Sequence, residues 1–84
     1  MIGIYKIQNK VNGKIYVGQS INIENRWKQH IRELNKEIHC NQHLLNSWKK
    51  YGQENFEFNI ICTCNIEELD EKEMYYIDLY KTYN

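Results

Sequence analysis

The fold of this chain is decided by one stretch near its N-terminus, GIYKIQNKVNGKIYVG, at positions 3–18. Residues 2–8 and 14–18 mix β-branched, aromatic and polar side chains, a composition typical of strands. Between them, Asn12 and Gly13 favour a tight turn, because both residue types tolerate the positive φ that such a turn requires. The stretch therefore predicts an antiparallel β-hairpin.

The register of this hairpin determines which side chains share a face. With the turn centred on Asn12 and Gly13, Asn9 pairs with Tyr16. Tyr5 lies on the same side as Asn9, because strand side chains alternate with a period of two. We therefore expect Tyr5 and Tyr16 to project from one face of the hairpin.

Two helices are predicted next along the chain. Asn22 is placed to cap a helix that runs to about Lys36. Apolar side chains recur on it at helical spacing: Ile23, Trp27, Ile31 and Leu34. Arg26 and His30 are four residues apart, so they share a face beside this stripe. The second helix is predicted for residues 41–51, which carry the next apolar group and end before Gly52: Leu44, Leu45, Trp48 and Tyr51.

A third strand and a last helix complete the predicted elements. Residues 56–62 read as a buried strand. Asn65, with Glu68 three residues later, predicts a capped helix that runs to about Tyr80. The apolar stripe expected on this helix consists of Ile66, Leu69, Tyr76, Ile77 and Tyr80.

Glu73 falls in the centre of that apolar stripe. A carboxylate there has to be paired, neutralised or bound to a metal ion, because burying a bare charge is very costly. Periodicity alone favours a glutamate at the rim of the stripe, paired with a lysine or arginine, over a metal ligand.

The composition fits one small globular domain over residues 1–84, with a single modest core. Hydrophobic residues make up 42% of the chain and charged residues 26%, the balance of an ordinary soluble protein. No apolar run approaches the ~20 residues that span a bilayer, and the N-terminus lacks a secretory signal pattern. We therefore expect a cytoplasmic protein without membrane partners.

The formal net charge is zero, but the charges are unevenly divided. Residues 1–50 hold nine Lys or Arg and three Glu, a net charge of +6. Residues 51–84 hold two Lys and eight Asp or Glu, a net charge of −6. This asymmetry indicates that the first half presents a basic surface to phosphates, with Lys28 and Arg32 as candidate DNA contacts. The alternative is a dipolar, solvated surface.

The sequence contains candidate ligands for a zinc site, but the spacing of the cysteines does not match one. Three cysteines, an odd number, are too few for a disulfide framework. The candidate ligands would be Cys40, Cys62 and Cys64, with His39 and His43. The single residue between Cys62 and Cys64 is a tighter spacing than structural zinc sites use. Cys62 also continues the apolar run of Ile60 and Ile61, where cysteine behaves as a small hydrophobe.

Gly3-Ile4-Tyr5 and Tyr16-Val17-Gly18 together resemble the paired motif of the GIY-YIG endonuclease family. Other landmarks of that family follow in order, so that the resemblance covers essentially the whole chain: Arg26, His30, His39, Glu73 and Asn84. The second motif has valine where the family name has isoleucine, a conservative variant. Residues 39–52 and 56–58 are most similar to phage and intron-encoded homing endonucleases.

The resemblance implies an α/β (α+β) fold, with a small, three-stranded, mainly antiparallel sheet flanked by three helices. It also implies hydrolysis of DNA that depends on Mg²⁺ or Mn²⁺, and a protein of a bacterium or a phage-infected cell. Members of the family often continue into further DNA-binding modules, so such modules are expected beyond residue 84.

The resemblance assigns roles to the candidate residues. Glu73 would hold the metal ion, and Arg26 would clamp the scissile phosphate with its planar guanidinium. Tyr5 or Tyr16 would orient or deprotonate the attacking water, with His30 as partner. His39 would position the phosphate or a tyrosine, and Asn84 is the least certain member. We expect Tyr5, Tyr16, Arg26, His30 and Glu73 to converge on one concave surface.

Each of these residues also has a structural interpretation. The two tyrosines are candidates for sheet-packing aromatics, Arg26 and His30 for a solvated helix face, and His39 for a loop residue. The main rival hypothesis is a catalytically silent domain of the same fold that binds nucleic acid or protein. It gives no reason for a carboxylate in the apolar stripe of a helix.

Overall fold

The computed structural model describes residues 1–80, and Asn84 lies outside these described residues. Residues 1–80 form three strands and three helices: β1 (Gly3–Asn9), β2 (Ile15–Ser20), α1 (Ile23–Asn35), α2 (Gln42–Tyr51), β3 (Phe56–Thr63) and α3 (Leu69–Tyr80). Short 3-10 turns at Gln53–Asn55 and Ile66–Glu68 lead into β3 and α3. Among residues 1–80, no helix has the length and apolar character needed to cross a membrane.

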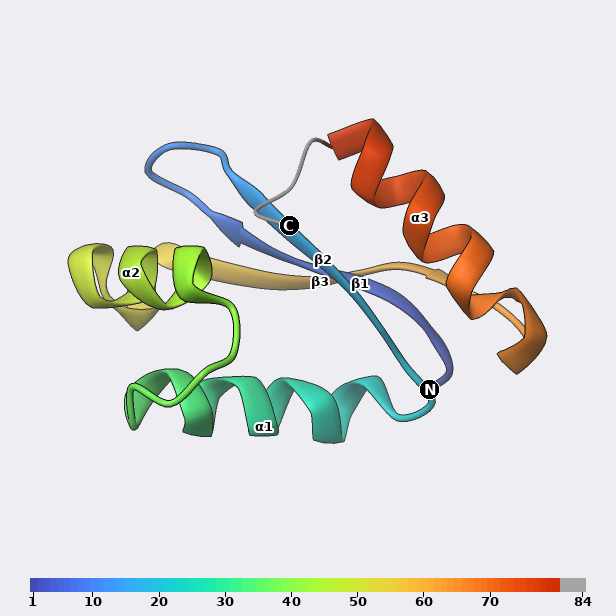
Figure 1. Ribbon diagram of the computed structural model, residues 1–84, viewed down its shortest axis with the longest axis horizontal. Coiled ribbons are helices and arrows are strands. Elements are labelled where there is room, and N and C mark those ends of the chain that lie inside the picture. Colours follow the sequence, from blue (N-terminus) through green and yellow to red (C-terminus); the bar gives the residue numbers. More distant parts are fainter. Residues whose placement is uncertain (81–84) are drawn as a thin grey trace.

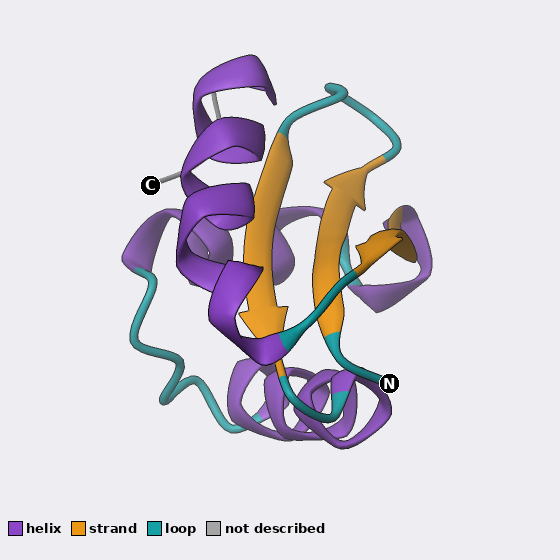
Figure 2. Ribbon diagram, turned by 90° about the vertical axis from the view of Figure 1, so that its right-hand side faces the viewer, coloured by secondary structure: helices purple, strands orange, loops and turns teal. Residues whose placement is uncertain are grey.

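The three strands form one antiparallel sheet in the order β2-β1-β3. Figures 1 and 2 show α3 on one face of this sheet, whereas α1 and α2 lie on the other side. The predicted α+β architecture is therefore confirmed. Strand β3 is an edge strand, and its side chains are mostly half-buried or exposed. The expectation of a buried third strand was wrong, because β3 lies at an edge of the sheet and α3 packs mainly on β2 and β1.

The hairpin register differs from the predicted one by two residues. Tyr16 pairs with Ile7, not with Asn9. The connection is longer than a two-residue turn, because the Asn9 side chain accepts a hydrogen bond from the backbone N–H of Val11 at 2.8 Å. Gly13, at φ 77°, closes the loop by donating to the Asn9 carbonyl. A slip by an even number preserves the faces, so Tyr5 and Tyr16 do share one face, as predicted.

Both motif glycines lie where another atom occupies the space of a β-carbon. At Gly18 a β-carbon would overlap the hydroxyl of Tyr5, whose ring crosses this position from the neighbouring strand. At Gly3 it would overlap the carbonyl oxygen of Cys62 on β3. The glycine after Tyr16-Val17 therefore allows the Tyr5 ring to lie flat against β2.

Two apolar clusters hold the helices on the sheet. One joins β1 to α1 and α2 and consists of Tyr5, Ile7, Ile23, Leu34, Leu44, Leu45, Trp48 and Phe56. The other lies under α3 and centres on Ile4, Val17 and Leu69, with Tyr76, Ile77 and Tyr80 packed against it. Ile66 was expected in this stripe but is 56% exposed. It belongs to the 3-10 turn before α3, so the helical periodicity does not extend to it.

The predicted caps set the helix boundaries. The side chains of Asn22 and Asn41 accept hydrogen bonds from the first turns of α1 and α2. Asn65 and Glu68 form a reciprocal capping box before α3. The backbone N–H of Gly52 donates to the carbonyl of Trp48 at 2.9 Å, where α2 ends. These polar residues explain why the helices begin and end close to the predicted positions.

Candidate active site

Tyr5, His30 and His39 form a buried chain of hydrogen bonds between β1, α1 and the loop before α2. The Tyr5 hydroxyl lies 2.6 Å from Nε2 of His30. Nδ1 of His30 lies 2.6 Å from Nε2 of His39. The three residues are 1%, 0% and 5% exposed, respectively. Because α1 places His30 against the sheet face that carries Tyr5, the predicted face of this helix is a catalytic candidate rather than a solvated surface.

Burial keeps both histidine rings of this chain neutral. Burial is the main cause that lowers the pKa of His30 to about 3, and the charges of Arg26 and His39 contribute to this shift in the same direction. Burial also lowers the pKa of His39, against the opposing effect of the Glu33 carboxylate. A proton on either ring would have to be held away from water, so both rings act as neutral hydrogen-bonding groups near neutral pH.

Burial of neutral His30 predicts that the protein loses stability in mild acid. The folded-state pKa is about 3, whereas an unfolded histidine titrates near ~6.5. Between these values the unfolded chain binds a proton that the folded chain excludes, so stability is lost as the pH falls below the unfolded pKa. The free energy of unfolding should fall by up to ~1.4 kcal/mol per pH unit, measured by urea unfolding from about pH 6.5 to about pH 5.

His43, exposed on α2, provides the matched control for this acid sensitivity. We expect His43→Gln to keep the pH slope and His30→Gln to lose most of it. Equal slopes in the two variants would contradict a neutral, buried His30.

Tyr16 and Arg26 complete this side of the site. The Tyr16 ring meets the His30 ring edge to face at 5.6 Å between centroids, and it is partly exposed. Burial raises the pKa of Tyr5 and of Tyr16, and the positive charge of Arg26 opposes this shift at both hydroxyls. The half-buried guanidinium therefore lies close to both phenols.

Glu73 reaches the site from the other face of the sheet. Nε2 of Gln19, on edge strand β2, donates to the Glu73 carboxylate at 3.3 Å and to Asp70 at 2.7 Å. Glu73 is half-buried, and no lysine or arginine within residues 1–80 lies within 4.0 Å of it. The rim salt bridge favoured by periodicity alone is therefore absent from the described part of the chain.

The candidate residues surround the β2 edge instead of sharing one face. Tyr5 and Tyr16 lie on the face covered by α1, whereas α3 covers the opposite face. The expectation of a single concave surface was wrong in this respect. Glu73 lies on the α3 side of the sheet, where its carboxylate contacts Gln19 of β2. The negative charge of Glu73 nevertheless raises the pKa of both tyrosines, although burial is the main cause at each. The carboxylate and the phenols are therefore electrostatic neighbours across one edge strand.

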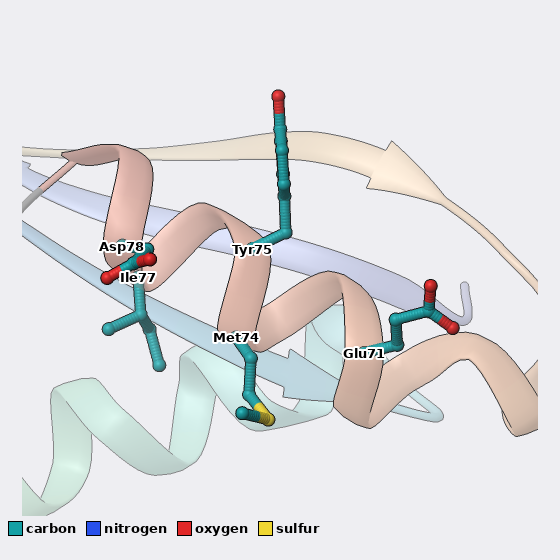
Figure 3. Close-up of a pocket in the computed structure, with 5 residues that line it drawn as sticks. All are labelled: Glu71, Met74, Tyr75, Ile77 and Asp78. Atoms are coloured by element: carbon teal, nitrogen blue, oxygen red, sulfur yellow. The ribbon is translucent and has the colours of Figure 1, made fainter.

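The structure also separates some candidates from this site. Lys28 and Arg32 are exposed on α1 and, at about 100° per residue, point away from Arg26. A surface hollow on α3, drawn in Figure 3, is lined by side chains with no predicted catalytic role: Glu71, Met74, Tyr75, Ile77 and Asp78. Gln19 and Asp70 were missed in the sequence, because their contact joins two elements far apart in the chain.

The metal-binding capacity of the site rests on oxygen ligands. Mg²⁺ is usually bound through one or two carboxylates, with waters and phosphate oxygens completing its shell. A half-buried Glu73 without a cationic partner in residues 1–80, and with Asp70 on the same Gln19 amide, fits that ligand set. The predicted zinc ligands do not form a site, because residues 1–80 contain no group of three His, Cys, Asp or Glu that could hold a metal ion. Cys62 and Cys64 instead pack under α3.

Comparison with known proteins identifies close similarity in both sequence and structure. The family model of the GIY-YIG catalytic domain matches residues 1–84. Intron-associated endonuclease 1 of Enterobacteria phage T4 is 42% identical over 59 residues, which cover 70% of this chain and 24% of that protein. The chain thus spans about a quarter of the length of this relative.

Two solved structures share the fold over nearly their whole length. The catalytic domain of the homing endonuclease I-TevI matches with a TM-score of 0.91 and 32% identity, covering 100% of this chain and 97% of that one. A mutant of the same catalytic domain matches with a TM-score of 0.89 and 32% identity, covering 99% and 91% of the two chains. With the motif residues gathered around β2 and the family model matched over residues 1–84, the chain belongs to the GIY-YIG family, as a GIY-YIG catalytic domain.

Proposed function

We propose that this domain is a metal-dependent DNA endonuclease of the homing type. The observation that carries the proposal is the group of two phenols, one guanidinium and one half-buried carboxylate around the edge strand β2. Hydrolysis of a phosphodiester needs three things that these groups can supply: an oriented water, positive charge at the phosphate, and a cation near the leaving oxygen.

Arg26 binds the scissile phosphate in this proposal. Its guanidinium is half-buried, lies beside both phenols, and forms no ion pair within residues 1–80. Two N–H groups of a planar guanidinium match two oxygens of one phosphate. The clamp would therefore hold the phosphorus atom next to the hydroxyls of Tyr5 and Tyr16.

Tyr5 or Tyr16 orients the attacking water, and the one that acts as the base would take up the water's proton as a phenolate. Tyr16 is partly exposed, whereas Tyr5 is 1% exposed, so solvent reaches Tyr16 more readily. A neutral phenol is a weak base, and burial makes its phenolate less stable still. The positive charge of Arg26 opposes that effect at both hydroxyls.

Glu73 binds a divalent cation, Mg²⁺ or Mn²⁺, through its carboxylate. The cation would supply positive charge beside the scissile phosphate and the leaving oxygen. Gln19 and Asp70 would keep the Glu73 carboxylate on the β2 edge, because the Gln19 amide donates to both acids. Asn84, which belongs to the same family pattern, lies outside the described residues.

Nicking of supercoiled plasmid DNA tests this function. We expect relaxed circles to accumulate with Mg²⁺ or Mn²⁺ and not with EDTA. The exposed acidic residue Glu71 provides a control on the same helix, and Glu71→Gln should nick at the wild-type rate. A silent binding domain of the same fold would leave the plasmid intact at every metal concentration while still retarding it in a gel.

The affinity for DNA should rest on the basic first half of the chain. We expect the double substitution Lys28→Gln and Arg32→Gln to weaken binding and to flatten its salt dependence. The slope of log affinity against log salt should fall by up to ~2, since about 0.9 counterion is released for each phosphate that a basic side chain neutralises. Binding is measured by fluorescence anisotropy of a labelled duplex over a range of salt concentrations.

Lys10→Gln with Lys14→Gln removes the same charge from the hairpin loop and is the matched control. A smaller change in this control would locate the phosphate contacts on α1. An equal change in both double variants would mean that only net charge matters, and wild-type slopes in both would contradict a basic DNA-binding surface in residues 1–50.

A further inference from the structure

The hydrogen-bond chain behind Tyr5 has one end whose direction is known. The backbone N–H of Asn41, at the start of α2, points at Nδ1 of His39 with an N···N distance of 3.0 Å. A backbone amide can only donate, so Nδ1 of His39 accepts and carries no proton. The next two links, from His39 to His30 and from His30 to Tyr5, are each 2.6 Å long.

This one direction determines the other two. A neutral imidazole carries one proton, so His39 carries it on Nε2 and donates it to Nδ1 of His30. Nδ1 of His30 then accepts, which puts the proton of His30 on Nε2, where it donates to the Tyr5 oxygen. The reverse direction would leave Nδ1 of His39 with a proton facing the amide hydrogen of Asn41, so only one arrangement satisfies every link.

We infer that the Asn41 amide and His39 act as positioning groups that hold His30 as a hydrogen-bond donor to Tyr5. The inference rests on the proposed function only for its catalytic meaning, since the direction of the chain follows from the contacts alone. His30 is therefore not the group that takes a proton from Tyr5. In neutral Tyr5, the hydroxyl proton points away from His30. In a Tyr5 phenolate, His30 would stabilise the negative charge on the oxygen.

The surroundings of Tyr5 agree with this direction. The titratable and charged groups that act on its hydroxyl come from β2, α1 and α3. They are Tyr16, Arg26 and Glu73, together with His30, which is hydrogen-bonded to the hydroxyl. A Tyr5 phenolate would be stabilised by the His30 donor and by the positive charge of Arg26. A proton leaving Tyr5 has to move toward the phosphate side of the site, because Nε2 of His30 is already protonated.

Nitrogen NMR of the imidazole rings tests the direction without metal, DNA or activity. In ¹⁵N-labelled wild-type protein near neutral pH, we expect both His30 and His39 as the neutral tautomer with the proton on Nε2. A His30 ring protonated on Nδ1, or on both nitrogens, would overturn the inference. Plasmid nicking is measured separately, so an inactive protein with these tautomers would contradict the proposed function and leave the hydrogen-bond direction intact.

Two substitutions at His39 test the consequence for catalysis. The amide nitrogen of a glutamine can replace the Nε2 donor, whereas leucine cannot donate. We expect His39→Leu to let His30 populate the Nδ1–H tautomer and to lower nicking about tenfold, the effect of removing one hydrogen bond. His39→Gln should keep the His30 tautomer and lose less activity. Equal losses with an unchanged His30 tautomer in both variants would overturn the inference, and the wild-type spectrum decides if either variant fails to fold.

Discussion

Glu73→Gln is expected to abolish Mg²⁺-dependent nicking while the melting temperature without metal stays equal or rises. Glutamine keeps the size of the side chain and can still contact Gln19, but it lacks the charge that binds a cation. In the described part of the chain, the wild-type carboxylate has no cationic partner and lies close to Asp70 on the same amide. Removing this charge relieves repulsion between two acids, so stability is not lost.

The magnitude of the activity loss separates this role from a structural one. Loss of a group that supports charge at the reacting phosphate lowers the rate by at least ~100-fold. A glutamate that only formed a surface ion pair would leave activity intact and cost up to ~1 kcal/mol of stability when substituted. Nicking rate and melting temperature are measured for Glu73→Gln beside Glu71→Gln. An active, less stable Glu73→Gln protein would contradict the mechanism.

Arg26→Lys is expected to lower the nicking rate by about a hundredfold with little effect on folding. Lysine keeps the positive charge but presents a single ammonium group, so it cannot bind two phosphate oxygens as a planar fork. It also shifts the charge that opposes the raised pKa of Tyr5 and Tyr16. The rate is measured at saturating DNA, and folding is followed by circular dichroism and thermal unfolding.

Arg32→Lys is the control for this substitution, because Arg32 is exposed on the same helix and lysine keeps the positive charge with which this position would contact DNA. It should nick at close to the wild-type rate. If Arg26→Lys also cleaved at the wild-type rate, the phosphate clamp would have to lie elsewhere in the chain.

The fold could be predicted from local signals, because each element of this small domain begins or ends at a recognisable polar residue. Asn22, Asn41 and Asn65 accept hydrogen bonds from the helix turns that follow them. Tyr5 and Tyr16 lie on one face as predicted, although the predicted register was wrong, because the register differs by two residues. Local capping and strand alternation are properties of neighbouring residues, so they are visible without the tertiary structure.

The arrangement of the site depended on contacts that no local pattern encodes. Gln19 holds Glu73 from a strand that lies far from α3 in sequence. The order β2-β1-β3 puts β2 at an edge, where groups from both faces of the sheet can meet. The apolar stripe of the last helix was extended to Ile66, because periodicity does not distinguish a 3-10 turn from the first turn of an α-helix.

The direction of the hydrogen bonds from Asn41 through His39 and His30 to Tyr5 could not be predicted from the sequence either. His30 was expected to be the partner of a tyrosine, and His39 to position the phosphate or a tyrosine, because of their place in the family pattern. Their tautomers follow from the backbone amide of Asn41, whose position depends on how α2 begins. A backbone group therefore determines what two candidate catalytic side chains can do.

The location of the metal ion tests the central claim most directly. Anomalous diffraction from crystals soaked in Mn²⁺ should give a peak at about 2.1 Å from a Glu73 carboxylate oxygen, the usual distance for a small divalent cation. That peak should lie at the β2 edge beside Gln19. A strong peak at Cys62 and Cys64, with none at Glu73, would contradict a catalytic metal centre built around β2.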